Sequence, residues 1–506
     1  MIRPCGASSR IALIFGCLIA CASARVALAE DELPSPIAAA LQRAAIPAGA
    51  ASFYVQEVGA FSRREARHEA SAASGAMTVA PARFAVRGEF RPLLSVRSDR
   101  PMNPASTMKL VTTYAALELL GPAYTWKTVA ASNAPVVGAT LEGDLYLRGA
   151  GDPKLVYESF WLLLRQLRAR GIQSLHGDLV LDRGLFDAGA YDPSAFDNEP
   201  VRPYNVGPDA LLVNFKAIAL RFIPDDAKRE VRVTAEPPLA DFTIDAVPYA
   251  DGPCGDWKAR VAADFTRRDR VAFAGAFAGS CGEQNWNVAV LDHRQYVGAL
   301  FKKLWSELGG TFQGKVRDGA LPIDARVLAE RESPSLAEIV RDINKYSNNV
   351  MAKELYLSLA AEVLKLQANP DRAQRVIRNF FSNKGIAMPE LVIENGSGLS
   401  RRERISALSM ARLLQAAWSS PVMPEFVSSL SLVGYDGTMR RRLNQKSVAG
   451  QAHIKTGTLN DARAVAGYVT AASGKRYVVV CFVNHANAGA AQAAQDALLQ
   501  WVYERG

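Results

Sequence analysis

Histidine is scarce in this chain, and its few copies do not cluster. The five histidines stand at positions 68, 176, 293, 453 and 485. No pair of them has the spacing of a zinc motif, and no Gly-x-Ser-x-Gly segment is present to hold the nucleophile of a Ser-His-Asp hydrolase. The sequence therefore predicts no metal site and no other cofactor, and we interpret His453 as an edge-strand residue.

Basic runs with interleaved aromatic residues are also missing. The net charge is +9, and it falls to +6 once the N-terminal leader, with three arginines and no acidic residue, is removed. An excess of this size over a long chain is typical of a solvated surface, with at most weak attraction to an anionic polymer or membrane. Nucleic acid is therefore not an expected partner.

No run of about 20 apolar residues, the length that crosses a bilayer, occurs in the chain. The apolar stretch Ile11–Ala22 is shorter, follows the basic residues Arg3 and Arg10, and precedes the small-x-small sequence Ala27-Leu28-Ala29. This order is typical of a secretory signal peptide. We predict that residues 1–29 are removed and that the mature protein works outside the cytoplasm.

Cysteine is scarce too, because three of the six copies lie in the leader, at positions 5, 17 and 21. Cys21 ends a Leu-Ile-Ala-Cys sequence that resembles a lipoprotein box, so a lipid-anchored N-terminus stays open as the alternative. Cys254 and Cys281 each adjoin a glycine in a turn-rich region, and we predict a disulfide between them in an oxidising compartment. Cys481, in an apolar strand-like run, is expected to be a buried free thiol.

Patterns of helix and strand divide the remaining chain into three parts. Residues 30–125 hold helical and strand-like segments, interrupted over 60–90 by an Ala- and Arg-rich addition without period. Residues 126–290 carry many short strand-like runs between Gly, Pro and Asp, which predicts a β-rich insertion of one or two smaller domains. Helical patterning returns over 291–506, which ends in three strand-like runs with tight turns and a final helix. We therefore expect an α/β (α+β) fold with an antiparallel sheet flanked by helices.

Ser106-Thr-Met-Lys109 begins an apolar helical pattern and is the first candidate for chemistry. Residues three apart share a helix face, so Lys109 Nζ can reach Ser106 Oγ. A serine in the first turn also lies near unpaired backbone N–H groups that suit a developing anion. Lys109 can accept a proton only if burial or a nearby cation lowers its pKa from about 10.4. Taken alone, the stretch favours a helix cap followed by a surface charge.

Two further segments supply what such a pair would need. Ser347-Asn348-Asn349 lies between two helical patterns, where Ser347 could relay a proton and Asn349 could hold the lysine or a substrate amide. Its simpler interpretation is a helix N-cap. Lys455-Thr456-Gly457-Thr458 lies on an expected strand, with a cation and a hydroxyl for a carboxylate and a bare glycine against which a peptide could add as a strand. Lys455 would also keep Lys109 neutral.

These three segments, in this order, resemble the active-site set of the penicillin-recognising serine acyltransferases. The 241 residues between Ser106 and Ser347 and the 108 between Ser347 and Lys455 resemble the class C low-molecular-mass penicillin-binding proteins, the D-Ala-D-Ala carboxypeptidase/endopeptidase family of penicillin-binding protein 4 type. Further similar stretches begin at Gly149 (GAGDP), Asn395 (NGSGLSR) and Tyr435 (YDGT). The resemblance implies a serine β-lactamase/transpeptidase-like domain.

The same resemblance implies a mechanism and a substrate. Ser106 would attack the carbonyl between two D-alanines of a peptidoglycan peptide, with Lys109 as base and Ser347 as proton donor to the departing D-Ala. The backbone N–H groups of Ser106 and Thr458 would form the oxyanion hole. Water would release the acyl group, β-lactams would act as covalent inhibitors, and the location would be the periplasm. A subsite for the diaminopimelate side chain is expected at Glu199, Tyr204 and Arg401.

Two other functions are weighed against this one. A secreted serine β-lactamase shares the Ser106/Lys109 pair, but the chain lacks the Glu-x-x-Leu-Asn segment with which class A enzymes deacylate rapidly, and its insertion is long. A catalytically silent wall-binding scaffold would not need all three motifs intact.

Overall fold

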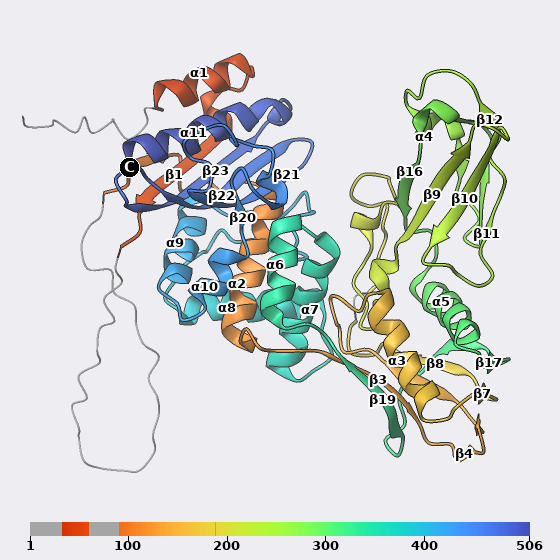
Figure 1. Ribbon diagram of the computed structural model, residues 1–506. Helices are drawn as coiled ribbons and strands as arrows, with labels where there is room; N and C mark the ends of the chain where they lie inside the picture. The colour runs from red at the N-terminus through yellow and green to blue at the C-terminus, as the bar shows by residue number, and fades with distance from the viewer. Residues whose placement is uncertain (1–32, 60–90, 188) are drawn as a thin grey trace, which may run out of the picture.

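A computed structural model describes residues 33–59, 91–187 and 189–506. The expected signal peptide over 1–29, the lipidation site at Cys21 and the addition over 60–90 lie outside the described residues. Within the described part, one body is built on a six-stranded sheet, and a second, elongated part stands beside it (Figure 1).

The six-stranded sheet joins the two ends of the chain. Its strand order is β2-β1-β23-β22-β21-β20, and every neighbouring pair is antiparallel. The strands are β1 (Ala51–Glu57), β2 (Leu94–Val96), β20 (Ser431–Leu432), β21 (Ala452–Thr458), β22 (Ala462–Thr470) and β23 (Arg476–Asn484). The antiparallel sheet flanked by helices is confirmed.

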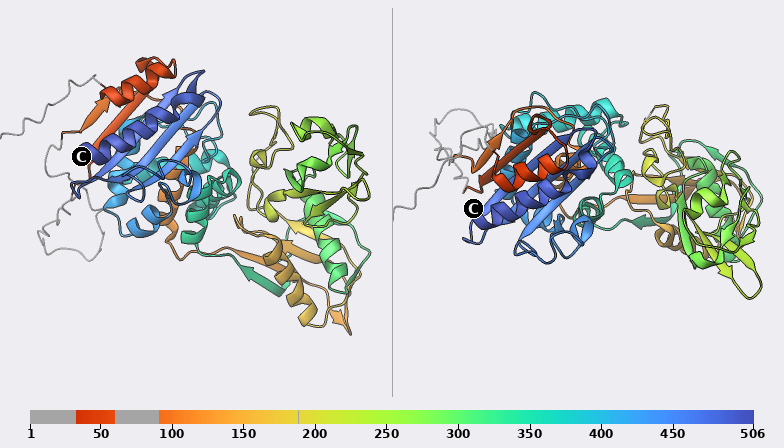
Figure 2. Two further views of the ribbon diagram at one scale, coloured as in Figure 1. Left: turned by 45° about the horizontal axis from the view of Figure 1, so that its top comes forward. Right: turned by 90° about the horizontal axis from the view of Figure 1, so that it is seen from above.

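Helices cover both faces of this sheet, which explains why its central strands are apolar without alternation. In β23, Val478, Val480 and Phe482 belong to the core beneath the sheet, whereas Val479, Cys481 and Val483 belong to the core above it. The upper core is closed by α1 (Ser35–Arg43) and α11 (Gln492–Arg505), which pack against each other (Figure 2). The lower core holds α2 (Lys109–Leu120), α6 (Leu336–Tyr346), α7 (Asn349–Leu364), α8 (Pro370–Asn383), α9 (Ala407–Trp418) and α10 (Met423–Ser428).

Helix α2 is the centre of the lower core. Its residues from Lys109 to Leu117 are all buried, as expected for a helix that is apolar on every side. A 3₁₀ turn, η2 (Ala105–Met108), precedes it, and α6, α7 and α8 pack around it. The start of α2 faces the strands β21 and β22, because η2 contacts both.

The insertion leaves this body along β3 (Lys127–Ser132) and returns along β19 (Arg326–Glu332), which pair antiparallel with each other. They belong to a sheet of order β18-β8-β6-β3-β19, in which β19 is an edge strand and β3 also pairs with β6. The other strands are β6 (Leu145–Arg148), β8 (Leu179–Asp182) and β18 (Val316–Asp318). The insertion therefore extends to Glu332 rather than to the expected residue 290. Helix α5 (His293–Glu307) packs in its core together with α3 (Tyr157–Ala169).

The far part of the insertion is a set of small sheets around aromatic side chains. The sheet β10-β9-β16 is formed by β9 (Ile218–Asp225), β10 (Glu230–Glu236) and β16 (Gln284–Val288). Phe222 packs against Trp257 and Phe277, with ring centroids 5.1 and 5.4 Å away. The structure joins Cys254 to Cys281, and it leaves Cys481 free and buried.

The shortest elements complete the insertion. Strands β17 (Thr311–Phe312), β7 (Ser174–Leu175), β5 (Thr140–Leu141) and β4 (Val136–Val137) form a four-stranded sheet in that order. The remaining short elements are β11 (Thr243–Ile244), β12 (Tyr249–Ala250), α4 (Trp257–Val261), β13 (Ala263–Asp264), β14 (Arg270–Phe273) and β15 (Phe277–Ala278). In the described residues, no helix is long and apolar enough to span a membrane.

Candidate active site

The backbone around Ser106 is held in a tight, strained turn. Ala105 has φ +47°, a left-handed conformation that is costly for a residue with a Cβ and that occurs often at functional sites. Asn103 fixes the turn, because its Oδ1 accepts the N–H of Ala105 at 2.9 Å and its Nδ2 donates to Ser400 O at 2.8 Å. Ser106 is thus presented at the start of η2 and α2.

Lys109 lies one turn after Ser106 and has no exposed surface. Its Nζ is 3.1 Å from Ser106 Oγ, 2.6 Å from Asn349 Oδ1 and 2.5 Å from Ser397 O. A neutral amine has two N–H groups and one lone pair. With the carbonyl oxygens of Asn349 and Ser397 as acceptors for the two N–H groups, the lone pair is available to the Ser106 hydroxyl.

The surroundings of Lys109 favour this neutral form. Its pKa lies well below the usual value, first because of burial and then because of the nearby cation Lys455, with Lys353 acting in the same direction and Glu403 opposing it. The sequence predicted the contribution of Lys455, but burial is the larger cause.

Ser347 and Lys455 form the second half of the site. Lys455 is fully buried, its Nζ lies 2.8 Å from Ser347 Oγ, and it also donates to Thr456 O at 2.7 Å. Burial lowers the pKa of Lys455 to about 7. Ser347 is left-handed (φ +57°) between α6 and α7, while the helix cap is its neighbour Asn348, whose side chain accepts the N–H of Met351. The segment therefore serves both as the helix cap and as the support of the site.

Strand β21 offers a free edge beside these side chains. Its pairing with β20 includes His453 and Ile454 and ends there, so the edge of Lys455–Thr458 on that side has no strand partner among the described residues. The opposite edge pairs with β22 throughout. A free edge of this kind is a template for an extended peptide.

Gly457 allows the nucleophile to approach this strand. A Cβ on Gly457 would lie 2.7 Å from Pro104 O and 3.0 Å from Ser106 N, closer than side chains normally come. Gly398 has a similar role on the other side of the turn, because its φ is +81° and a Cβ there would lie 2.0 Å from Ala105 O. Both glycines are therefore required by close packing around Ser106.

Thr438, in the Tyr435-Asp-Gly-Thr segment, extends the site beyond Thr456. The two threonine hydroxyls are 2.8 Å apart. Two contacts hold this segment in place: Asp436 pairs with Lys345 at 2.5 Å, and the N–H of Thr438 donates to Ser431 Oγ. Sequence reasoning quoted this segment only as a likeness and assigned Thr438 no role.

At the rim, the structure brings Arg401 together with Phe196 of the insertion. The Arg401 guanidinium lies 4.5 Å from the centroid of the Phe196 ring and pairs with Asp461 at 2.9 Å. Phe196 also packs against the apolar cluster that contains Ala105 and Leu459. No sequence pattern pointed to Phe196, because it stands alone in a polar, turn-rich segment.

The structure pairs Glu199 and Tyr204 within their own loop instead of with Arg401. Glu199 contacts Arg202 at 3.3 Å, and the Tyr204 hydroxyl donates to Asp197 Oδ2 at 2.7 Å. Both side chains are nevertheless exposed, so their expected role in a subsite stays a prediction.

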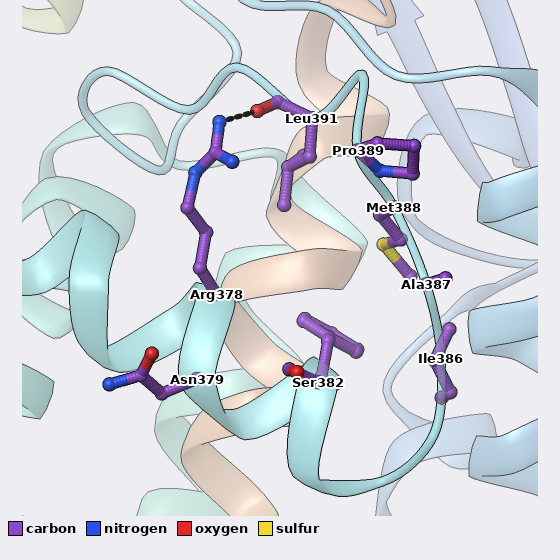
Figure 3. A pocket seen from close by; sticks show the side chains of 9 residues that line it. Arg378, Asn379, Ser382, Ile386, Ala387, Met388, Pro389 and Leu391 are labelled. Carbon is purple, nitrogen blue, oxygen red and sulfur yellow. Dashed lines mark hydrogen bonds between the residues drawn. The ribbon is translucent and has the colours of Figure 1, made fainter.

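A cavity of about 420 Å³ lies elsewhere, between α8 and the segment over 386–391. It is lined by Phe381, Ile386, Met388 and Leu391, with Arg378 closing one side through a hydrogen bond to Leu391 O (Figure 3). No residue of the three motifs lines it. Among the described residues, no group of three or more His, Cys, Asp and Glu side chains is arranged to hold a metal ion.

The buried lysine beside a serine that follows a strained turn, with a second serine–lysine pair and a free strand edge, defines a serine hydrolase that works through an acyl-enzyme. Residues 74–505 match the D-Ala-D-Ala carboxypeptidase 3 (S13) family, and the chain belongs to this family. The resemblance to class C low-molecular-mass penicillin-binding proteins is thereby confirmed.

Individual relatives agree with this assignment. A D-alanyl-D-alanine carboxypeptidase of Actinomadura sp. (strain R39) is 31% identical over 415 residues, which cover 78% of this chain and 76% of that protein. The D-alanyl-D-alanine carboxypeptidase DacB of Haemophilus influenzae is 25% identical over 393 residues, covering 77% and 81%. The crystal structure of penicillin binding protein 4 from H. influenzae has the same fold, with a TM-score of 0.75 at 21% identity over 92% of this chain and 99% of that one.

Proposed function

We propose that this protein cleaves the bond between two D-alanines in peptidoglycan stem peptides, and the related bond in peptide cross-links, through an acyl-enzyme on Ser106. The observation that carries the proposal is the position of Lys109, which is fully buried and within 3.1 Å of Ser106 Oγ. A lysine held without a carboxylate partner at its Nζ in such a place functions as a neutral base.

Acylation follows from this geometry. Lys109 Nζ takes the proton of Ser106 Oγ as Oγ bonds to the substrate carbonyl carbon, and the carbonyl electron pair moves to its oxygen. The N–H groups of Ser106 and Thr458 stabilise that oxyanion. Ser347, held by Lys455, then donates its hydroxyl proton to the departing D-Ala nitrogen as the C–N bond breaks. The proton on Lys109 replaces it, so Lys109 is neutral again and Ser347 is restored.

The substrate peptide lies along the free edge of β21 and adds to the sheet as a short strand. Its terminal carboxylate is received by the hydroxyls of Thr456 and Thr438, near the cation Lys455. The side chain of the preceding stem residue, diaminopimelate, lies against Arg401 and Phe196, where the guanidinium meets its carboxylate and the ring meets its methylenes. In this proposal Phe196 takes the place that was first expected for Glu199 and Tyr204.

Water releases the acyl group from Ser106 and completes hydrolysis, whereas a β-lactam leaves an adduct that is released slowly. The periplasm is the proposed location. The leader over 1–29 and the Cys254–Cys281 disulfide, which requires an oxidising compartment, support it. Anchoring through Cys21 remains the alternative to a free mature chain.

The test is covalent labelling by a fluorescent penicillin, read on a denaturing gel. We expect the wild type and the surface control Ser473→Ala to carry the label, and Ser106→Ala to carry none. Release of D-Ala from a stem pentapeptide should show the same pattern. Label on Ser106→Ala, or none on the wild type, contradicts the role of Ser106. Hydrolysis of a chromogenic cephalosporin faster than of the pentapeptide would favour the β-lactamase.

A further inference from the structure

Glu403 is a fully buried carboxyl group that belongs to none of the three motifs. One of its oxygens, Oε1, accepts three backbone N–H groups, those of Glu394 at 2.9 Å, Asn395 at 3.0 Å and Gly396 at 3.3 Å. Burial raises the pKa of Glu403, and the three donors on one oxygen oppose this because they stabilise the charged form. The second oxygen, Oε2, is buried and has no hydrogen-bond partner in the structure.

The segment that Glu403 holds is the one that reaches the base. Directly after the three N–H groups, the chain turns through Gly396 (φ +72°) and presents its carbonyl groups to α2. Gly396 O accepts the hydroxyl of Thr112 at 2.7 Å, and Ser397 O accepts Lys109 Nζ at 2.5 Å. The N–H side of the segment is therefore fixed by Glu403, and its carbonyl side fixes Lys109.

The charges around Lys109 show a second effect of this carboxylate. Lys455 from β21 and Lys353 from α7 both lower the pKa of Lys109, and the carboxylate of Glu403 acts in the opposite direction. Two other groups interact with this carboxylate. The charge of Glu394, in the same segment, raises the pKa of Glu403, and the charge of Glu403 raises the pKa of Tyr356 on α7. When Lys109 takes up a proton, a cation forms in a dry site between two other lysines, where a nearby anion has a large effect.

We propose that Glu403 is a positioning residue for acylation: it holds the Ser397 carbonyl on Lys109 and supplies the negative charge that stabilises protonated Lys109. The proton moves from Ser106 Oγ to Lys109 Nζ as the Oγ–C bond forms, and Glu403 neither gives nor takes a proton. The inference rests on the proposed roles of Ser106 and Lys109.

The test is the pH profile of acylation by a fluorescent penicillin in Glu403→Gln, which keeps the shape of the side chain and removes its charge. Without the anion, the pKa of Lys109 falls, so the neutral base persists to lower pH. We expect the acidic limb of the profile to move down by about one pH unit and the plateau rate to fall by about tenfold. A change of packing alone would lower the rate without moving the limb.

Glu330→Gln is the control, because Glu330 is an exposed carboxylate of the insertion that pairs with Lys127 and lies outside the segment that Glu403 holds. Its acidic limb should stay at the wild-type pH. If Glu403→Gln fails to fold, the test is made with Glu403→Asp and Glu403→Asn, which have equal size and differ in charge. The acidic limb of the pH profile should lie at a lower pH in the Asn variant than in the Asp variant.

An unshifted limb in Glu403→Gln, or equal limbs in the Asp and Asn variants, overturns the inference while leaving the role of Ser106 intact. Absence of label on the wild type would instead remove the proposed function itself, so the two failures are distinguishable.

Discussion

At the scale of single residues, the site depends on how closely the Ser106 turn approaches β21. Gly457→Ala places a methyl group 3.0 Å from Ser106 N and 2.7 Å from Pro104 O. The turn must shift to accept it, and this displaces an N–H group of the oxyanion hole. We expect the acylation rate to fall by about a hundredfold, measured with a fluorescent penicillin.

Gly489→Ala is the control for this prediction, because a Cβ there would meet nothing within 4 Å. It should keep the wild-type acylation rate. A Gly457→Ala variant that acylates like the wild type would show that the turn has room to adjust.

Individual residues also show how far the sequence could be interpreted. Ser106, Lys109, Ser347 and Lys455 could be proposed from the sequence, because each belongs to a short local motif and the three motifs follow one another in a distinctive order. Glu403 and Phe196 could not be, since the residues that they affect, Lys109 and Arg401, lie far from them along the chain. Glu199 and Tyr204 illustrate the same limit, because a polar loop residue finds local partners that no pattern reveals.

At the scale of elements, helix α7 connects the catalytic centre to the insertion. Its first residue, Asn349, holds Lys109, and one turn later Lys353 Nζ donates to the Tyr191 hydroxyl at 2.7 Å and to Val206 O at 3.0 Å. The segment between Tyr191 and Val206 carries Phe196, which contacts Arg401. Helix α7 therefore positions both the base Lys109 and the segment that carries Phe196 at the rim of the site.

Lys353→Met should therefore separate substrate recognition from chemistry. It removes the donor that holds the Phe196 segment, and leaving a buried acceptor without its hydrogen bond costs about 1–3 kcal/mol. We expect kcat/KM for a diaminopimelate-containing pentapeptide to fall by about tenfold, while acylation by a small penicillin above pH 8 changes little. The exposed Lys303→Met serves as the control. Equal losses with both substrates would contradict this role of α7.

Element boundaries could be predicted from the sequence where local patterns determine them, and not where distant strand pairing does. The helix starting after Ser106 and the C-terminal hairpins could be predicted, because their patterns and turns are local. The end of the insertion could not, because β19 pairs with β3 about 200 residues earlier, and a non-local pairing leaves no trace in the sequence around position 290.

At the scale of the whole molecule, the insertion and the body that carries Ser106 have separate cores. The core of the insertion contains Phe222, Leu300 and Trp305, while the helical core beneath the sheet contains Tyr114, Leu355 and Phe482. The Cys254–Cys281 disulfide closes a loop of 27 residues inside the insertion only. A change in its stability should therefore leave the chemistry on η2 and β21 largely intact.

Replacing both cysteines by serine should destabilise the insertion by about 3 kcal/mol, because the unfolded chain loses a covalent constraint. Thermal unfolding should show a lower first transition, and dithiothreitol should produce the same effect in the wild type. Acylation by a fluorescent penicillin should stay within about twofold of wild type, since Ser106 and Lys109 lie in the other core. Loss of acylation together with the first transition would show that the two cores unfold as one.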